Sequence, residues 1–145
     1  MPETIQSKLN FEYADFVIES GKVREFAHSI GLKNPIYFDR EVARKEGFKN
    51  IPVPPTFATV MDFWNDRNFY QLFTFLNLKP ENILHGEQSY EYIKDIYAED
   101  TMSSRVIVKG ISKKNDKTFY NLETTYRNDQ LEIVMINKAT LIELL

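Results

Sequence analysis

A proline-rich corner followed directly by a very apolar segment constrains the fold of this chain more than any other feature. The run IPVPP at residues 51–55 cannot be helical or form a central strand, so the chain must turn there. Thr56 can then cap a helix that begins FATVMDFW, residues 57–64, in which apolar side chains lie on nearly every side. Such a helix must be buried on most of its faces.

One strand and two short helices are predicted before the corner. Residues 9–18 are aromatic and β-branched enough for a strand. Apolar residues then recur at helical spacing between Ser20, which can act as an N-cap, and Gly31, which is expected to end the helix in the left-handed conformation. Asn34-Pro35 predicts a turn, and Asp39 can cap a charged helix over residues 40–46 that ends at Gly47.

The second half of the chain changes from helical to alternating periodicity. A second apolar helical segment, residues 69–78, follows an interruption at 65–68. Strands are then expected at residues 84–96, 103–111, 118–127 and 131–144, with turns between them. The last three form a meander of antiparallel strands. We therefore expect one α+β domain over residues 1–145, with a curved antiparallel sheet around the buried helix.

Composition excludes several classes of function. The net charge of −3 and the pI near 5.5 argue against nucleic acid as a partner, which would need a basic surplus. The chain has no Cys, so it has no thiolate nucleophile, disulfide or Cys-based metal site. No apolar run is long enough to span a membrane, and no signal-peptide pattern opens the sequence. A soluble cytoplasmic protein without cofactor or metal is expected.

Two stretches of the sequence, in this order, carry a resemblance to a known family. They are NPIYFDREVARKEGFKNIPVPPTFA at residues 34–58 and LHGEQSYEYIKDIYAEDTM at residues 84–102. Together they look like the N-terminal dehydratase domain of the MaoC-like family, over nearly the whole chain. The resemblance implies a hot-dog fold, in which an antiparallel sheet wraps a central helix. The layout is similar to the substrate-binding subunit of bacterial heterodimeric (3R)-hydroxyacyl-ACP dehydratases and to the N-terminal half of enoyl-CoA hydratase 2.

Catalytic members of that family carry a D-x-N-P-(I/V)-H motif, whose Asp and His hold a water against an enoyl thioester. Laying the motif on the Asn34-Pro35 turn puts Leu32 at the Asp position and Tyr37 at the His position. Leu has no proton to exchange, and Tyr, with a reference pKa of about 10, is a poor base at neutral pH. The resemblance therefore implies a hydratase frame that lacks its acid–base pair.

His85 and Glu87 are the alternative catalytic candidates, because residues two apart on a strand point to the same side. A structural or partner-binding role of this HGEQ stretch is the favoured interpretation. Asn34 is interpreted mainly as a turn residue, Asp39 as a helix cap and His28 as a surface residue.

The apolar segment after the corner supplies the predicted binding surface. Core packing and a dimer interface must account for most of its side chains, and the resemblance implies that the rest line an acyl-chain tunnel, which would contribute about 0.8 kcal/mol per buried CH₂. A weak basic cluster at Arg40, Arg44, Lys45 and Lys49 could contact an acyl-carrier protein or the phosphates of CoA. The predicted substrate-binding residues are Asn34, Tyr37, Pro55, Thr56, Phe57, Val60, Met61, Trp64, Phe69 and Phe73.

The predicted function is the substrate-binding half of an (R)-specific 3-hydroxyacyl-thioester dehydratase or enoyl hydratase. The chain would be inactive alone and would need a catalytic MaoC-like partner. Two alternatives stay open. One is a self-sufficient homodimeric hydratase or thioesterase that uses His85 and Glu87, and the other is a non-enzymatic acyl-CoA or fatty-acid binding module. A homodimer or heterodimer is expected because a single such sheet leaves its edges exposed.

Overall fold

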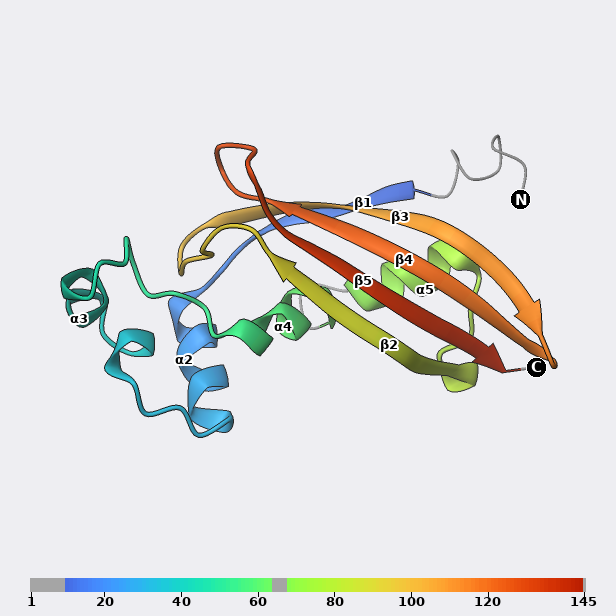
Figure 1. The fold of residues 1–145 in the computed structure, drawn as a ribbon, viewed down its shortest axis with the longest axis horizontal. Helices are drawn as coiled ribbons and strands as arrows, with labels where there is room; N and C mark the ends of the chain where they lie inside the picture. The colour runs from blue at the N-terminus through green and yellow to red at the C-terminus, as the bar shows by residue number, and fades with distance from the viewer. Residues whose placement is uncertain (1–9, 64–67, 145) are drawn as a thin grey trace.

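A computed structural model describes residues 10–63 and 68–144, and its main element is a five-stranded antiparallel sheet (Figure 1). β3, β4 and β5 form the predicted meander, β1 adds to β3 at one edge, and β2 adds to β5 at the other. The strands are β1 (Asn10–Val17), β2 (Ile83–Tyr92), β3 (Thr101–Lys114), β4 (Lys117–Arg127) and β5 (Ile133–Leu144).

Helical segments cover one face and one end of this sheet. In Figure 1, α4 and α5 lie along the concave face, while α2 and α3 lie beyond the end of the sheet at which β2 ends and β3 begins. The segments are α2 (Ser20–Ser29), η1 (Pro35–Tyr37), α3 (Arg40–Lys45), η2 (Pro55–Phe57), α4 (Ala58–Phe63), α5 (Asn68–Leu76) and η3 (Pro80–Asn82), where η marks a 3₁₀ turn. The predicted curved sheet around a central helix is confirmed. No helix of the described residues is long and apolar enough to cross a membrane.

Local signals set the ends of several of these helices, but two of the predicted caps are wrong. Ser20 is the first residue of α2 and not its cap, because the N-cap position is Glu19, whose side chain makes no capping hydrogen bond. Asp39 caps α3, since its Oδ1 accepts hydrogen bonds from the backbone N–H groups of Glu41 and Val42 at 2.8 and 3.2 Å. The prediction of Thr56 as a cap is wrong. The 3₁₀ turn η2 begins at Pro55, whose fixed φ suits the first helical position, so Thr56 lies inside the turn. Most of the predicted interruption at 65–68 lies outside the described residues.

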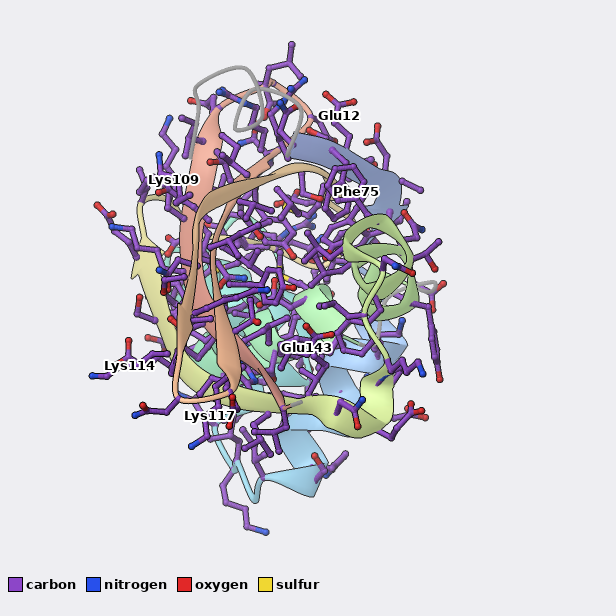
Figure 2. The ribbon with its side chains drawn as sticks, turned by 90° about the vertical axis from the view of Figure 1, so that its right-hand side faces the viewer. Glu12, Phe75, Lys109, Lys114, Lys117 and Glu143 are labelled. Atoms are coloured by element: carbon purple, nitrogen blue, oxygen red, sulfur yellow. The ribbon has the colours of Figure 1, made fainter. Side chains whose placement is uncertain are left out.

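The sheet curls because several strands carry bulges, where one extra residue bends the strand. On β2 the register shifts between His85 and Glu87, at Gly86. A side chain at Gly86 would put its Cβ 2.9 Å from Ile142 Cδ1 and 3.3 Å from the Thr140 carbonyl oxygen, so a larger residue would require Ile142 and the neighbouring backbone to shift. Figure 2 shows the resulting curl of the sheet around α5.

The concave face holds two hydrophobic clusters. Phe57, Ala58 and Met61 of η2 and α4 pack with residues of β3, β4 and β5 in the first. Leu72 and Phe73 of α5 pack with the other half of the same strands in the second. In Figure 2, Phe75 of α5 lies on the enclosed side of the sheet and Lys109 of β3 on the outside. The two consecutive helices therefore fill the interior end to end.

Candidate functional site

The loop between α2 and α3, on which the hydratase motif was aligned, holds no carboxylate–imidazole pair. The Oδ1 of Asn34 accepts a hydrogen bond from the backbone N–H of Ile36 at 3.2 Å and caps η1. Leu32 is half-buried, and its N–H donates to the carbonyl oxygen of Ala27 at 3.0 Å. Tyr37 is half-buried at the end of η1. Asn34 therefore has a complete structural explanation as a turn residue.

A polar cluster of Arg40, Asn50 and Glu99, called the latch below, connects α3 and the proline-rich corner to the loop between β2 and β3. The buried Asn50 accepts from Arg40 Nε at 3.1 Å and from the N–H of Ile51 at 2.8 Å, and donates to the carbonyl oxygen of Ala98 at 3.1 Å. Arg40 also forms an ion pair with Glu99. Of the predicted basic cluster, Arg40 thus has a structural role.

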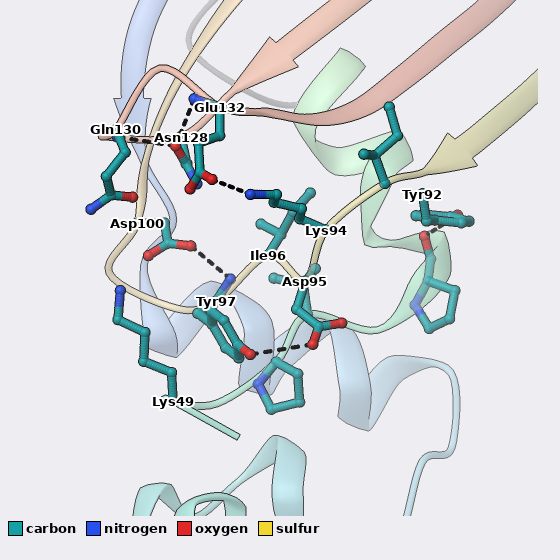
Figure 3. Close-up of a pocket in the computed structure, with 14 residues that line it drawn as sticks. Lys49, Tyr92, Lys94, Asp95, Ile96, Tyr97, Asp100, Asn128, Gln130 and Glu132 are labelled. Carbon is teal, nitrogen blue, oxygen red and sulfur yellow. Dashed lines mark hydrogen bonds and ion pairs between the residues drawn. The ribbon is translucent and has the colours of Figure 1, made fainter. Parts of the chain in front are cut away.

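A groove of about 700 Å³ opens beside this latch (Figure 3). Its walls come from three segments that are distant in sequence: residues 49–55 of the corner, residues 92–100 from the last residue of β2 onward, and residues 128–132 between β4 and β5. At one end the Tyr92 hydroxyl donates to the Pro55 carbonyl oxygen at 2.6 Å. Small-molecule sites usually measure roughly 300–1,000 Å³, so the groove is large enough to hold a ligand.

The charged groups on one wall of the groove neutralise each other. Lys94 forms an ion pair with Glu132, and Asn128 Nδ2 donates to the same carboxylate at 3.1 Å. These hydrogen bonds, with that from Lys94 the largest cause, lower the pKa of Glu132.

On the other wall, Tyr97 donates hydrogen bonds to two carboxylates, those of Asp95 and Asp100. Its hydroxyl donates to Asp95 Oδ2 at 3.3 Å, and its backbone N–H donates to Asp100 Oδ2 at 3.0 Å. Burial raises the pKa of Asp100, although the Tyr97 N–H and the charge of Lys49 act in the opposite direction. Hydrogen-bond donors and acceptors therefore line the groove with little excess charge of one sign.

Most of the predicted substrate-binding residues lie outside this groove. Only Pro55 lines it among those that the structure describes. Thr56 is exposed, and its carbonyl oxygen accepts from Thr59 Oγ1 at 2.7 Å. Phe57 and Met61 are each 1% exposed, and Val60 packs against the same cluster.

The space beside these core residues is small. Phe57, Val60 and Met61 line a cavity of about 10 Å³, which has room for about one water molecule. Phe73 belongs to the second cluster. Trp64 and the side chain of Phe69 lie outside the described part of the chain. In this structure Phe57, Val60, Met61 and Phe73 therefore serve the hydrophobic core.

The expectation that His85 and Glu87 point to the same side of a strand is wrong. The bulge at Gly86 pairs His85 with Leu141 and Glu87 with Thr140, and adjacent residues of a strand face opposite sides. The His85 ring packs on the ring of Phe63 below the sheet, with 5.3 Å between centroids. Glu87 instead lines a hollow on the outer face. The side chains of His85 and Glu87 therefore cannot bind and activate the same water molecule.

A buried carboxylate at the end of α4 was missed by the sequence reasoning. Asp62 is 6% exposed and accepts hydrogen bonds from the Tyr126 hydroxyl at 2.5 Å, from the Tyr90 hydroxyl at 3.4 Å and from Asn137 Nδ2. Gln88 of the edge strand in turn donates to Asn137. Burial raises the pKa of Asp62 to about 6, although its hydrogen bonds act to lower it.

This cluster joins the central helix to strands β2, β4 and β5. The one available signal was an acidic residue inside the apolar run FATVMDFW, because a buried charge must find partners. The sequence could not name those partners, which lie 28, 64 and 75 positions away. Within residues 10–63 and 68–144, no group of three or more His, Cys, Asp or Glu side chains could hold a metal ion.

Comparison with known sequences finds one matching family and several relatives. A family model described as "FAS1-like, dehydratase domain region" matches residues 8–137. A UPF0336 protein of Streptomyces avermitilis is 31% identical over 90 residues, which cover 62% of this chain and 59% of the relative. A UPF0336 protein of Saccharopolyspora erythraea is 27% identical over 121 residues, 83% of this chain and 77% of the relative. The chain thus spans less than two thirds of the first relative's length.

Solved structures share the architecture at low sequence identity. A chain of the HadBC (3R-hydroxyacyl-ACP dehydratase) complex of Mycobacterium tuberculosis superposes with a TM-score of 0.77 and 23% identity, covering 92% of this chain and 93% of that one. An (R)-hydratase of A. caviae gives a TM-score of 0.71 and 18% identity, with 94% of both chains covered. These likenesses confirm the hot-dog fold that the sequence predicted.

Proposed function

This chain belongs to the FAS1-like dehydratase-region family, and we propose that it is the acyl-thioester-binding half of an (R)-specific 3-hydroxyacyl-thioester dehydratase or enoyl hydratase. A partner subunit supplies the Asp and His that activate water. This chain supplies the second hot-dog domain and a surface for the substrate, and it is inactive alone.

The observation that carries the proposal is the intact frame of the motif loop without its acid–base pair. The Asn34 cap, η1, α3 and the corner are all formed, while Leu32 and Tyr37 occupy the Asp and His positions of the resembling enzymes. The two imidazoles of the chain lie elsewhere: His28 packs on Phe38 with 4.5 Å between ring centroids, and His85 packs on Phe63.

Pairing with another subunit is supported by the sheet and by the solved relatives. In the described sheet β1 and β2 are edge strands, whose free N–H and C=O groups favour a neighbouring chain. Two of the similar structures are named as two-chain complexes, HadBC and ChsH1-ChsH2 of Mycobacterium tuberculosis. The separation of His85 from Glu87 removes the geometric basis of a self-sufficient enzyme that would use this pair.

Co-expression with a MaoC-like chain that carries the D-x-N-P-(I/V)-H motif tests the proposal. The two chains should copurify, and the complex should hydrate crotonyl-CoA or a longer enoyl-CoA at a rate that neither chain reaches alone. As a control, replacing the motif Asp of the companion by Asn should abolish turnover without releasing this chain.

Three results would contradict the proposal. The first is enzymatic turnover by this chain alone, and the second is a loss of turnover in a His85→Ala variant that still copurifies. Thioester binding without turnover in the presence of the companion would instead favour the non-enzymatic binding module.

A further inference from the structure

We propose that the groove between the proline-rich corner, the β2–β3 loop and the β4–β5 hairpin binds the neutral pantetheine arm that acyl-CoA and acyl-carrier protein share. This inference rests on the proposed function, because it assigns the place where the carrier part of the thioester lies. It names a site separate from the motif loop and from the interior of the sheet.

The shape of the groove suits an extended chain. Figure 3 shows its side chains spread between two ends, with Lys49, Asp100 and Gln130 at one and Tyr92 at the other. Its volume of about 700 Å³ exceeds that of the 10 Å³ cavity at the core by far. A pantetheine arm, which is a linear chain of methylene, amide and hydroxyl groups, needs an open trough of this kind.

The chemistry of the lining matches a chain of alternating apolar and amide groups. Pro52, Val53, Ile93 and Ile96 supply apolar surface. Donors and acceptors stand among them, and the Gln130 side-chain amide has no hydrogen bond among the described residues, although the Gln130 backbone N–H donates to Asn128. Such a set of a few polar groups on an apolar floor is typical of ligand sites.

The balance of charge favours the neutral arm over the phosphates that follow it. Lys94 is used by Glu132, and Lys49 stands near Asp100, whose pKa its charge lowers. Asp95 accepts from Tyr97. No described segment of the wall carries the cluster of free Lys and Arg side chains that several phosphates would need. Recognition here depends on hydrogen bonds and apolar contact.

The ends of the groove give the ligand a direction. The hydrogen bond from Tyr92 to the Pro55 carbonyl oxygen fixes one end at the first turn of η2, where the central helix begins. Side chains at both ends are exposed, including Tyr92, Lys49 and Gln130, so the direction rests on the contact of the Tyr92 end with η2. The thioester therefore lies at the Tyr92 end, and the carrier, whether nucleotide or protein, remains in solvent beyond Gln130.

The test is a titration of the chain, in the assembly in which it purifies, with thioesters of one acyl group on carriers of decreasing length. The series is acyl-CoA, acyl-pantetheine and acyl-N-acetylcysteamine, with octanoyl carrier protein as a separate arm. Acyl-pantetheine should bind within about threefold of acyl-CoA, and the N-acetylcysteamine thioester about tenfold or more weaker, since one lost amide contact is worth roughly a factor of ten.

Matched variants locate the arm. Ile93 lines the groove and Leu84 does not, and the two side chains, at opposite ends of the same strand region, are 45% and 51% exposed. Ile93→Trp should weaken acyl-pantetheine binding about tenfold, while Leu84→Trp should not. If the introduced Trp disturbs folding, a second pair of variants is available. Gln130→Ala alters a side chain that lines the groove, and Leu131→Ala, which alters the neighbouring residue outside the groove, is its control.

The outcomes separate this inference from the proposed function. Equal affinity for the long and short carriers, with no effect of Ile93→Trp and Gln130→Ala, overturns the groove assignment and leaves thioester binding in place. Much tighter and salt-sensitive binding of acyl-CoA overturns the preference for the neutral arm. If no thioester binds at all, the proposed function itself fails. A stronger effect of the variants on acyl-carrier protein than on acyl-CoA supports the inference and identifies the carrier protein as the source of the arm.

Discussion

The side chains around the central helix are buried in close packing, whereas those of the neighbouring groove are largely exposed and border an open space. At η2 and α4 the large apolar residues Phe57 and Met61 are almost completely buried, and the cavity beside them is about 10 Å³. At the groove, loops and strand ends enclose about 700 Å³, and exposed side chains such as Tyr92 and Ile93 line it. The large apolar side chains of the helical segment and the largest volume of the groove are therefore in different parts of the molecule.

This difference follows from the size of the domain. A small domain must use most of its large apolar side chains to build its core, so few remain to line a cavity. Loops are instead shaped by turns and polar contacts, and they can leave a gap between them that is lined by mixed groups. We therefore expect mutations at α4 to act on folding and mutations at the groove to act on binding.

The largest effect expected from this comparison is on stability at Phe57. Phe57→Ala leaves a cavity in the packed cluster and should lower the free energy of unfolding by about 3–5 kcal/mol, whereas Ile93→Ala at the groove should cost less than about 1 kcal/mol. Chemical denaturation of both variants, monitored by circular dichroism, measures the two values. Similar small losses at both sites, with a gain in affinity for longer acyl chains in Phe57→Ala, would make Phe57 a tunnel residue.

The next effect is a pH dependence of stability at Asp62. Its folded-state pKa of about 6 lies above the ordinary value of 3.8 for an Asp side chain, so its contribution to stability is fully present below that lower value and is lost as the pH rises through about 6. The free energy of unfolding should therefore fall by roughly 2–3 kcal/mol between pH 4 and pH 7 from this group. Urea denaturation at a series of pH values checks the sign.

Asp62→Asn should remove most of that fall, because the neutral amide keeps a hydrogen-bond acceptor and has no charge to bury. Asp95→Asn, which alters an exposed side chain of the groove, is the matched control and should keep the fall. An unchanged pH profile in Asp62→Asn would mean that the buried cluster does not hold an ionisable proton in this range.

The smallest effect concerns the latch between the two regions. Asn50→Ala leaves the N–H of Ile51 and the carbonyl oxygen of Ala98 without these partners and should cost about 1–2 kcal/mol of stability. Because the corner forms one wall of the groove, thioester affinity should fall as well. Lys49→Ala, at the exposed neighbour, should change stability little. Equal losses of stability in the two variants, measured by thermal denaturation, would mean that the hydrogen bonds of Asn50 do not stabilise the corner.

Much of the fold could be predicted from residues that are close in sequence. Helical spacing located α2, Asp39 marked the start of α3, and alternation with turn residues located the meander of β3, β4 and β5. Leu32 and Tyr37 could likewise be compared with the hydratase motif directly, without coordinates. These inferences depend on spacings of a few residues, which local backbone geometry converts into structure.

The tertiary structure alone decided which side chains meet. A single extra residue at Gly86 moved Glu87 to the opposite face of the sheet from His85. A glycine inside a strand is compatible with a bulge, but it does not fix which residues then pair across the strands. The partners of Asp62 come from three different strands, and the groove comes from three separate segments. Sequence thus determined the elements and the missing acid–base pair, whereas the site depended on register and curvature, because contacts between distant residues are set only when the strands pair.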